Sequence, residues 1–160
     1  PLDVRDDRSK FTCGHEDLDR YFKDLAGQQL KRGSAGIQVA VIGEEIVGVT
    51  TTVATEIQTD TLPASAAKSL PKRVPVLRLA RLAVSTNHQG EQVGKRLMKR
   101  TLEQALALRK THGCLGVVVD SKLEAETYYQ RFGFVSLEGQ SAPTLIPMFL
   151  PMGTIEEALR

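Results

Sequence analysis

The chain has 160 residues, 41% of them hydrophobic and 25% charged, so it falls with ordinary globular proteins and outside the disordered and fibrous classes. Its length predicts a single domain, residues 1–160, large enough to bury a core. No stretch approaches the ~20 apolar residues of a membrane helix, and the first residues lack a signal peptide's apolar core, so we expect a soluble, cytoplasmic protein that does not bind a membrane.

The formal net charge of +2 conceals an uneven distribution. Residues 61–110 hold eleven Lys and Arg but two Asp and Glu, whereas acidic residues outnumber basic ones on either side. A basic middle indicates an anionic ligand there, either a phosphorylated cofactor, a nucleic acid or both. A solvated basic helix face would explain the charge equally well. Of the two cysteines, Cys13 and Cys114, we expect free thiols, although a disulfide stays open, and no Cys/His cluster has metal-ligand spacing, so no metal is predicted.

The first half of the chain predicts a helix followed by a β-hairpin. Apolar residues recur at helical spacing over residues 15–31, and two glycines end that segment. Residues 37–41 alternate like a strand, residues 43–45 form a tight turn, and residues 46–54 are a β-branched run. Residues 55–75 are expected to be a long polar connection with a short helix at 64–70, and loops of that length are often functional.

The second half predicts alternating strands and helices. Strands are expected at 76–84, 114–119, 134–135 and 144–150, and helices at 93–110, at 124–132 and after Gly153. The nearly wholly apolar strand at 114–119 is typical of a sheet covered on both faces. The fold class is therefore α/β, with a mixed central β-sheet and helices on both faces.

The junction at residues 81–96 predicts an anion site. A strand leads into a turn with Gly90 and Gly94, and the turn opens a helix with Lys95 and Arg96 near its start. A helix N-terminus offers unpaired N–H groups and the positive end of its dipole, which suit a pyrophosphate. Many strand–turn–helix junctions bind nothing, however, and the acidic Glu91 opposes an anion here.

The same junction resembles the GCN5-related N-acetyltransferases (GNAT), whose acetyl-CoA signature is Gln/Arg-x-x-Gly-x-Gly/Ala. Gln89 and Gly94 match the first and last positions, whereas Gln92 replaces the middle glycine. The resemblance implies a GNAT fold and acetyl-CoA as co-substrate, and because the contacts are mostly backbone amides we expect the departure at Gln92 to be tolerated. The strand residues that would pair with the pantetheine arm are Leu82, Ala83 and Val84, and those that would hold the pyrophosphate are Gln89, Gly90, Glu91, Gln92, Val93, Gly94 and Lys95.

A run of aromatic residues follows about one strand later. On a helix, Ala125, Tyr129 and Phe132 fall on one face, which by itself is more typical of core packing than of catalysis. The run resembles the Tyr-x-x-Phe/Leu-Gly-Phe of many GNAT enzymes, in which the tyrosine lies beside the thioester sulfur. Tyr129 matches that position, and the resemblance implies that its phenol assists departure of the thiolate.

Other segments resemble one branch of this family, the tRNA-acetylating toxins of type II toxin–antitoxin modules. They are Phe11-Thr12-Cys13-Gly14, the strand around Arg78-Leu79-Ala80-Arg81-Leu82-Ala83-Val84, Val119-Asp120-Ser121-Lys122 and Phe149-Leu150-Pro151-Met152. The resemblance implies that the substrate is the α-amine of an aminoacyl-tRNA and that an antitoxin with a ribbon-helix-helix domain is the partner. It also makes a homodimer possible.

The predicted chemistry agrees with an α-amine substrate. No carboxylate stands on residues 76–84 as a general base, and an α-amine with a pKa of ~8 needs less help than a lysine with a pKa of ~10.4. Asp120 is expected to cap the following helix, with a role as a base through water as the alternative. Five basic residues could seat an acceptor stem by phosphate contacts: Lys68, Lys72, Arg73, Arg78 and Arg81. Pairing of Arg78 and Arg81 with acidic residues is the alternative, and a small-molecule or peptide acetyltransferase or a non-catalytic acetyl-CoA-binding module are the alternative functions.

Overall fold

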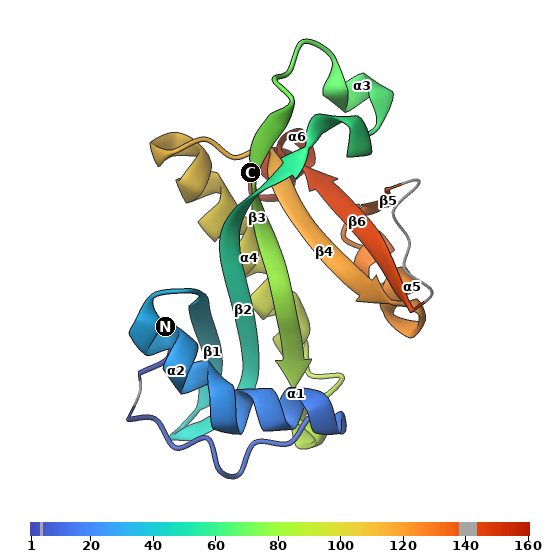
Figure 1. Ribbon diagram of the computed structural model, residues 1–160. Helices are drawn as coiled ribbons and strands as arrows, with labels where there is room; N and C mark the ends of the chain where they lie inside the picture. Colours follow the sequence, from blue (N-terminus) through green and yellow to red (C-terminus); the bar gives the residue numbers. More distant parts are fainter. Residues whose placement is uncertain (4, 138–143) are drawn as a thin grey trace. The chain divides into compact units, whose positions relative to one another are not determined.

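The protein forms a six-stranded mixed sheet with flanking helices, as the sequence predicts (Figure 1). The computed structural model describes residues 1–3, 5–137 and 144–160. The strand order is β1-β2-β3-β4-β6-β5, with β3 and β4 parallel and the pairs β1–β2, β4–β6 and β5–β6 antiparallel. The strands are β1 Gly36–Ile42, β2 Glu45–Gln58, β3 Arg73–Val84, β4 Gly116–Lys122, β5 Val135–Ser136 and β6 Leu145–Pro151. The α-helices are α1 Glu16–Arg20, α2 Ala26–Arg32, α3 Ala64–Ala67, α4 Val93–Thr111, α5 Glu126–Gln130 and α6 Met152–Ala158.

The chain divides into two compact units. Unit 1 comprises Pro1–Val53 and Ala80–Thr101, and unit 2 comprises Ala54–Leu79 and Leu102–Arg160. Every boundary between the units falls inside a secondary-structure element, namely β2, β3 or α4, and none falls in a loop.

In unit 1, the predicted helix at 15–31 is a continuous helical stretch interrupted by one π-turn. Helices α1 and α2 are joined by the π-helical residues Tyr21–Leu25, and Gly33 ends the stretch with a φ of 68°. The buried side chains of Phe22 and Ala26 pack against Ile37 of β1 and Val49 of β2. The stretch therefore covers one face of the strands in this unit.

The start of α4 covers the opposite face of the same strands. Val93 and Leu97 pack against Val47, with Leu82 and Val84 of β3 beside them. A β-bulge in the β1–β2 pairing shifts the register at Ala40 and Val41. At Gly48, next to this bulge, an added Cβ would lie 2.8 Å from side-chain atoms of both Val93 and Leu97, so the helix rests where the strand has no side chain.

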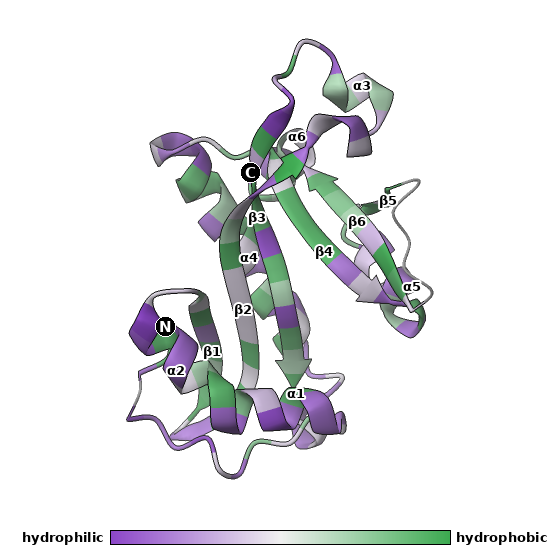
Figure 2. Ribbon diagram, in the orientation of Figure 1, coloured by the Kyte–Doolittle hydropathy of each residue, from purple (hydrophilic) through white to green (hydrophobic). Residues whose placement is uncertain are grey.

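Unit 2 is held together by the pairing of β4 with β6. Seven residues of each strand pair, from Gly116 with Pro151 to Lys122 with Leu145. In Figure 2, β4 is green in its first part and purple toward its end, and β6 is green on either side of a pale stretch. Helix α3 contributes Ala66 and Ala67 to a core cluster with Val118 and Phe149, which covers one side of this part of the sheet.

Several predicted boundaries are wrong. β2 extends to Gln58 and β3 begins at Arg73, so the predicted connection at 55–75 is much shorter; Thr59 N–H donates to the Lys72 carbonyl at its base. The extra strand residues alternate between half-buried and exposed positions, so polar side chains concealed the strand from a search for apolar runs. The helix expected at 124–132 is a 3-10 turn, Leu123–Ala125, followed by the short α5, and α6 begins before Gly153. Within the described ranges, no helix has the length and apolar character needed to span a bilayer.

Candidate functional site

The predicted anion-binding turn lies in unit 1, between β3 and α4. After β3, residues Thr86–His88 form a 3-10 turn, and residues 89–92 form a second turn that leads into the helix. The Gln92 carbonyl accepts the Arg96 N–H at 3.1 Å, so Gln92 stands directly before the first turn of α4. The N–H groups of Val93, Gly94 and Lys95 consequently have no acceptor within the helix. These three predicted residues thus share one helix N-terminus.

Two residues of this turn have left-handed backbone conformations. Gly90 has a φ of 84° and Gln92 a φ of 67°. Only glycine adopts this region without a steric penalty, so the backbone of Gln92 is in an unfavourable conformation. A glycine in the middle of the motif is therefore explained by the left-handed backbone at this position. Gln92 adopts the same backbone conformation at a steric cost.

The side chains of the turn bind the protein itself. The imidazole Nδ1 of His88 and a carboxylate oxygen of Glu91 are 2.8 Å apart, so the acidic group that opposed an anion has a local partner. The side-chain amide of Gln89 donates to the carbonyls of Cys13 at 3.2 Å and Val84 at 3.3 Å. Sequence reasoning missed this role for Gln89, since residues 13 and 89 are far apart in the chain.

The side chains of the predicted pantetheine-binding residues, Leu82, Ala83 and Val84, pack on the two faces of β3. Ala83 is buried on the side of α1 and α2, whereas Leu82 and Val84 point toward α4. The pairing of β3 with β4 consists of Leu77 with Val117 and Arg78 with Val118, so residues 82–84 are not among the pairs of these two strands.

Tyr129 lies in α5 of unit 2 and is 8% exposed. Burial raises the pKa of its phenol to about 12, and the neighbouring Tyr128 adds to this rise. The phenol therefore remains protonated throughout the physiological range. Its ring packs edge-on against Phe134, with 5.5 Å between ring centroids.

The ring of Phe132 packs against Tyr128, four residues before it, with ring centroids 5.2 Å apart. Helix α5 ends at Gln130, and Gly133 turns the chain with a φ of 99°. The phenol oxygen of Tyr128 is buried and has no hydrogen-bond partner among the residues that the structure describes.

The five predicted basic residues have different surroundings. Arg78 pairs with Asp120 at 2.9 Å, so Asp120 binds an arginine instead of capping a helix. In unit 1, the guanidinium carbon of Arg81 lies 3.6 Å above the centre of the Tyr21 ring. The Tyr21 hydroxyl is itself held by Gln29 and Thr51. The alternative of structural pairing is thus confirmed for Arg78, whereas Arg81 is stacked and no acidic side chain in the described ranges pairs with it.

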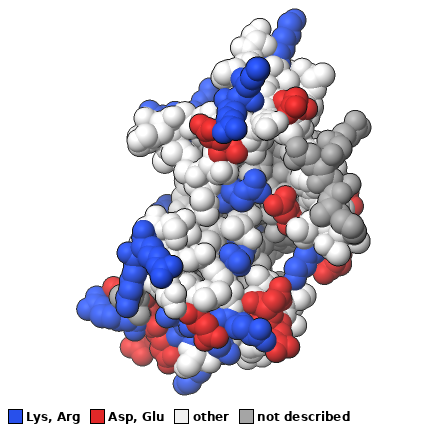
Figure 3. All heavy atoms as spheres, viewed as in Figure 1, with Lys and Arg blue, Asp and Glu red and all other residues white. Residues whose placement is uncertain are grey.

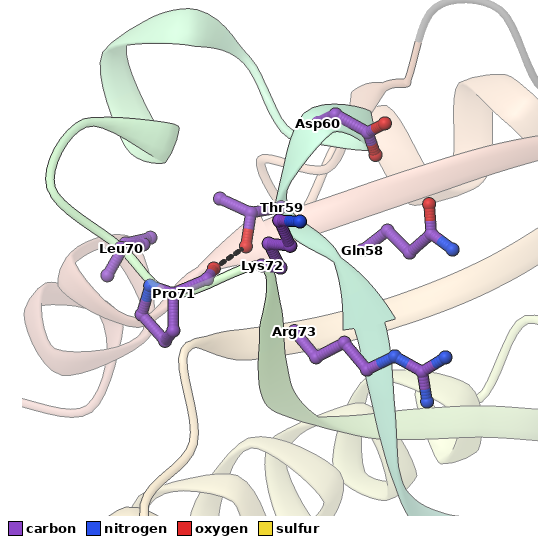
Figure 4. A pocket seen from close by; sticks show the side chains of 7 residues that line it. All are labelled: Gln58, Thr59, Asp60, Leu70, Pro71, Lys72 and Arg73. Carbon is purple, nitrogen blue, oxygen red and sulfur yellow. Dashed lines mark hydrogen bonds between the residues drawn. The ribbon is translucent and has the colours of Figure 1, made fainter.

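Lys72 and Arg73 line a cavity of about 610 Å³ in unit 2 (Figure 4). The wall between the end of β2 and the start of β3 is fixed by Thr59, whose hydroxyl donates to the Pro71 carbonyl. The other residues of this cavity are Gln58, Asp60 and Leu70. Lys68, at the end of α3, is exposed and is not part of it. On the face shown in Figure 3, acidic and uncharged side chains interrupt the basic ones.

Both cysteines are enclosed in the protein. Cys13 and Cys114 are buried free thiols, and burial raises the pKa of Cys13 to about 11. In the described part of the chain, no three His, Cys, Asp or Glu residues are arranged to hold a metal ion.

Comparison with known proteins links these features to one family. The family model of the acetyltransferase (GNAT) domain matches residues 33–136, which include both the turn and Tyr129. A relative, the tRNA-acetylating toxin of Mycobacterium tuberculosis (strain ATCC 25618 / H37Rv), is 25% identical over 130 residues, which make up 81% of this chain and 78% of the relative.

Solved structures share the fold. A crystal structure of a bacterial toxin has a TM-score of 0.90 at 22% identity and covers 99% of this chain and 89% of its own. AtaT complexed with acetyl-methionyl-tRNAfMet has a TM-score of 0.86 at 23% identity, covering 96% and 92%. An AtaT mutant toxin bound to the C-terminus of the antitoxin AtaR and acetyl-CoA has a TM-score of 0.81 at 21% identity, covering 98% and 94%.

Proposed function

The chain belongs to the GNAT family of acetyltransferases, and on that premise we propose that it transfers an acetyl group from acetyl-CoA to the α-amine of an aminoacyl-tRNA. The observation that carries the proposal is the helix N-terminus at Val93–Lys95, in a domain that also carries the buried phenol of Tyr129. Both elements lie inside the segment that the family model matches.

The cofactor part of the proposal rests on backbone groups. The free N–H groups of Val93, Gly94 and Lys95 would bind the pyrophosphate of acetyl-CoA, helped by the positive end of the helix dipole. Gly90 leaves the approach to the turn without a side chain. The peptide groups of Leu82, Ala83 and Val84 would pair with the amides of the pantetheine arm, because they take no part in the β3–β4 pairing.

The chemical step needs few side chains. The neutral amine attacks the thioester carbonyl carbon, the C–S bond breaks, and the sulfur leaves with the bonding electrons. We assign the Tyr129 hydroxyl to donate a hydrogen bond to that sulfur, which its raised pKa favours because the phenol keeps its proton. The ammonium product loses its proton to water, so a general base is not required for an amine with a pKa of ~8.

The tRNA part of the proposal rests on basic side chains and on the named relatives. One relative is a tRNA-acetylating toxin, and one structural neighbour holds an acetylated tRNA. Arg81, Lys72 and Arg73 form no ion pair with a carboxylate in the described ranges, and their cations would contact phosphates. Lys68 would add an outer contact, whereas Arg78 is already paired with Asp120 and becomes the weakest candidate.

The biological setting follows from the same proposal. A protein that acetylates aminoacyl-tRNA blocks translation, which places it in the cytoplasm and calls for an inhibitor. We propose that an antitoxin with a ribbon-helix-helix domain binds it, by analogy with the AtaT complex that contains the C-terminus of AtaR.

A labelling experiment tests the proposed function. The purified protein is incubated with labelled acetyl-CoA and a pool of charged tRNA, and the labelled aminoacyl species are identified. We expect one or a few aminoacyl-tRNAs to be labelled on the α-amine, with uncharged tRNA as the control. Labelling of small amines or peptides but no tRNA would instead identify a small-molecule or peptide acetyltransferase. Acetyl-CoA binding with no turnover would leave a binding module.

A further inference from the structure

The N-terminal segment Thr12–Gly14 is tied to the cofactor turn by backbone and side-chain hydrogen bonds. Thr86 N–H donates to the Thr12 carbonyl at 2.9 Å, and the Gln89 side-chain amide donates to the Cys13 carbonyl at 3.2 Å. Both donors belong to the short stretch between β3 and α4. Gly14 follows with a φ of 86°, and an added Cβ would lie 3.5 Å from the Thr86 side chain.

One carboxylate holds this segment from the other side. A carboxylate oxygen of Asp19, in α1, accepts the Cys13 N–H at 2.8 Å, and its second oxygen accepts the Thr12 hydroxyl at 3.0 Å. Asp19 is half-buried, and its side chain links helix α1 to the segment Thr12–Gly14. It therefore orients the two carbonyls that bind Thr86 and Gln89.

We propose that Asp19 is a positioning residue for acetyl-CoA binding, acting through Thr12 and Cys13 on the turn at residues 86–92. This inference rests on the proposed function, since it assumes that the turn binds the cofactor. Asp19 acts through the peptide groups of Thr12 and Cys13, whose carbonyls hold Thr86 and Gln89 in the turn that leads to Val93–Lys95. Because binding energies are reciprocal, a cofactor that orders the turn must also order residues 12–13.

Substitution of Asp19 separates positioning from folding. Asp19→Ala removes both acceptors, and we expect the Kd for CoA and the KM for acetyl-CoA to rise about fivefold or more, with kcat at saturation nearly unchanged. Asp19→Asn keeps an acceptor for the Cys13 N–H and offers a donor to the Thr12 hydroxyl, so it should restore most of the affinity. Asp24→Ala, which removes an exposed carboxylate from the same helical stretch, is the matched charge control and should leave both constants unchanged.

A destabilised control guards against a general loss of stability. Val39→Ala trims a side chain packed against the core cluster that includes Phe22 and Ile37, and it removes none of the hydrogen bonds of residues 12–13, so it should lower Tm and leave the Kd for CoA unchanged. If Asp19→Ala also lowers Tm but binds CoA as the wild type does, Asp19 is merely structural and the inference is wrong. If the wild type itself fails to bind CoA, the proposed function is wrong, and the inference about Asp19 is wrong with it.

A measurement on the wild-type protein does not depend on any variant folding. Acetyl-CoA should slow the alkylation of Cys13 by iodoacetamide more than that of Cys114, as followed by mass spectrometry. The Cys114 thiol is also buried, so it reports general stabilisation by the ligand. A change that is equal at both thiols would contradict the coupling of the turn to residues 12–13.

Discussion

The phenol of Tyr129 is suited to donate a hydrogen bond and keep its proton, because burial raises its pKa to about 12. Tyr129→Phe removes the donor and keeps the ring that packs on Phe134, so kcat should fall about 100-fold or more while Tm stays nearly constant. Tyr128→Phe is the matched control. It removes an oxygen that has no hydrogen-bond partner in the described residues, so it should leave kcat unchanged and raise stability by up to about 1 kcal/mol. Equal losses in the two variants would contradict a special role for Tyr129.

The raised pKa of Tyr129 also predicts the pH dependence. As pH increases, the substrate amine loses its proton, so kcat/KM should rise and level off near pH ~8. The phenol deprotonates only near its pKa of about 12, so a descending limb should be missing across the measurable alkaline range. A profile of kcat/KM between pH 6 and ~10 checks this expectation. A fall in kcat/KM beginning near pH 9 would show that another acid is at work.

Gln92 is the residue at which this chain departs from the family motif. Its φ of 67° carries a steric cost of about 1–2 kcal/mol that glycine avoids, although glycine loses about 0.5–1 kcal/mol through its greater freedom in the unfolded chain. Gln92→Gly should therefore leave Tm unchanged or raise it slightly, and the open turn should bind CoA more tightly. Gln92→Ala keeps the strained Cβ and should give neither benefit. Calorimetric titration with CoA and thermal unfolding measure both effects; weaker CoA binding by the glycine variant would contradict this account.

At the scale of elements, β3 places its two predicted tRNA arginines in different environments. Arg78 is paired with Asp120, whereas the guanidinium of Arg81 is stacked on the ring of Tyr21. Arg81→Gln should raise the KM for aminoacyl-tRNA and reduce the slope of log KM against log salt by about 0.9, the value for one phosphate contact. Arg78→Gln should leave that slope unchanged and cost at most about 1 kcal/mol of stability, as expected for a partly exposed ion pair. The reverse ranking would assign the phosphate contact to Arg78.

The order of elements was predictable because each carried its own pattern. The period of α4, the glycine turn before it and the β-branched run of β2 are local signals, and the structure confirms all three. The extension of β2 and β3 was not predictable, because their outer ends pair through the backbone while displaying polar side chains. The partners of Gln89, Arg81 and Asp120 were also beyond the sequence, since each contact joins residues that only the fold brings together.

At the scale of the whole molecule, the single domain predicted for residues 1–160 remains a prediction with a clear test. The boundaries of the two compact units lie inside β2, β3 and α4, so separating the units would require breaking three regular elements. We expect one cooperative unfolding transition, with equal calorimetric and van't Hoff enthalpies. Two resolved transitions in a calorimetric scan would instead identify two independently stable units.

The position of the start of α4 depends on the absence of a side chain at Gly48 in β2, far upstream in the sequence. A methyl group there would collide with Val93 and Leu97 and press the helix away from β2. The helix N-terminus that we propose as the pyrophosphate site would shift with it. Gly48→Ala should therefore weaken CoA binding without changing any residue of the turn, so a survey of natural variants limited to residues 86–95 would overlook this position.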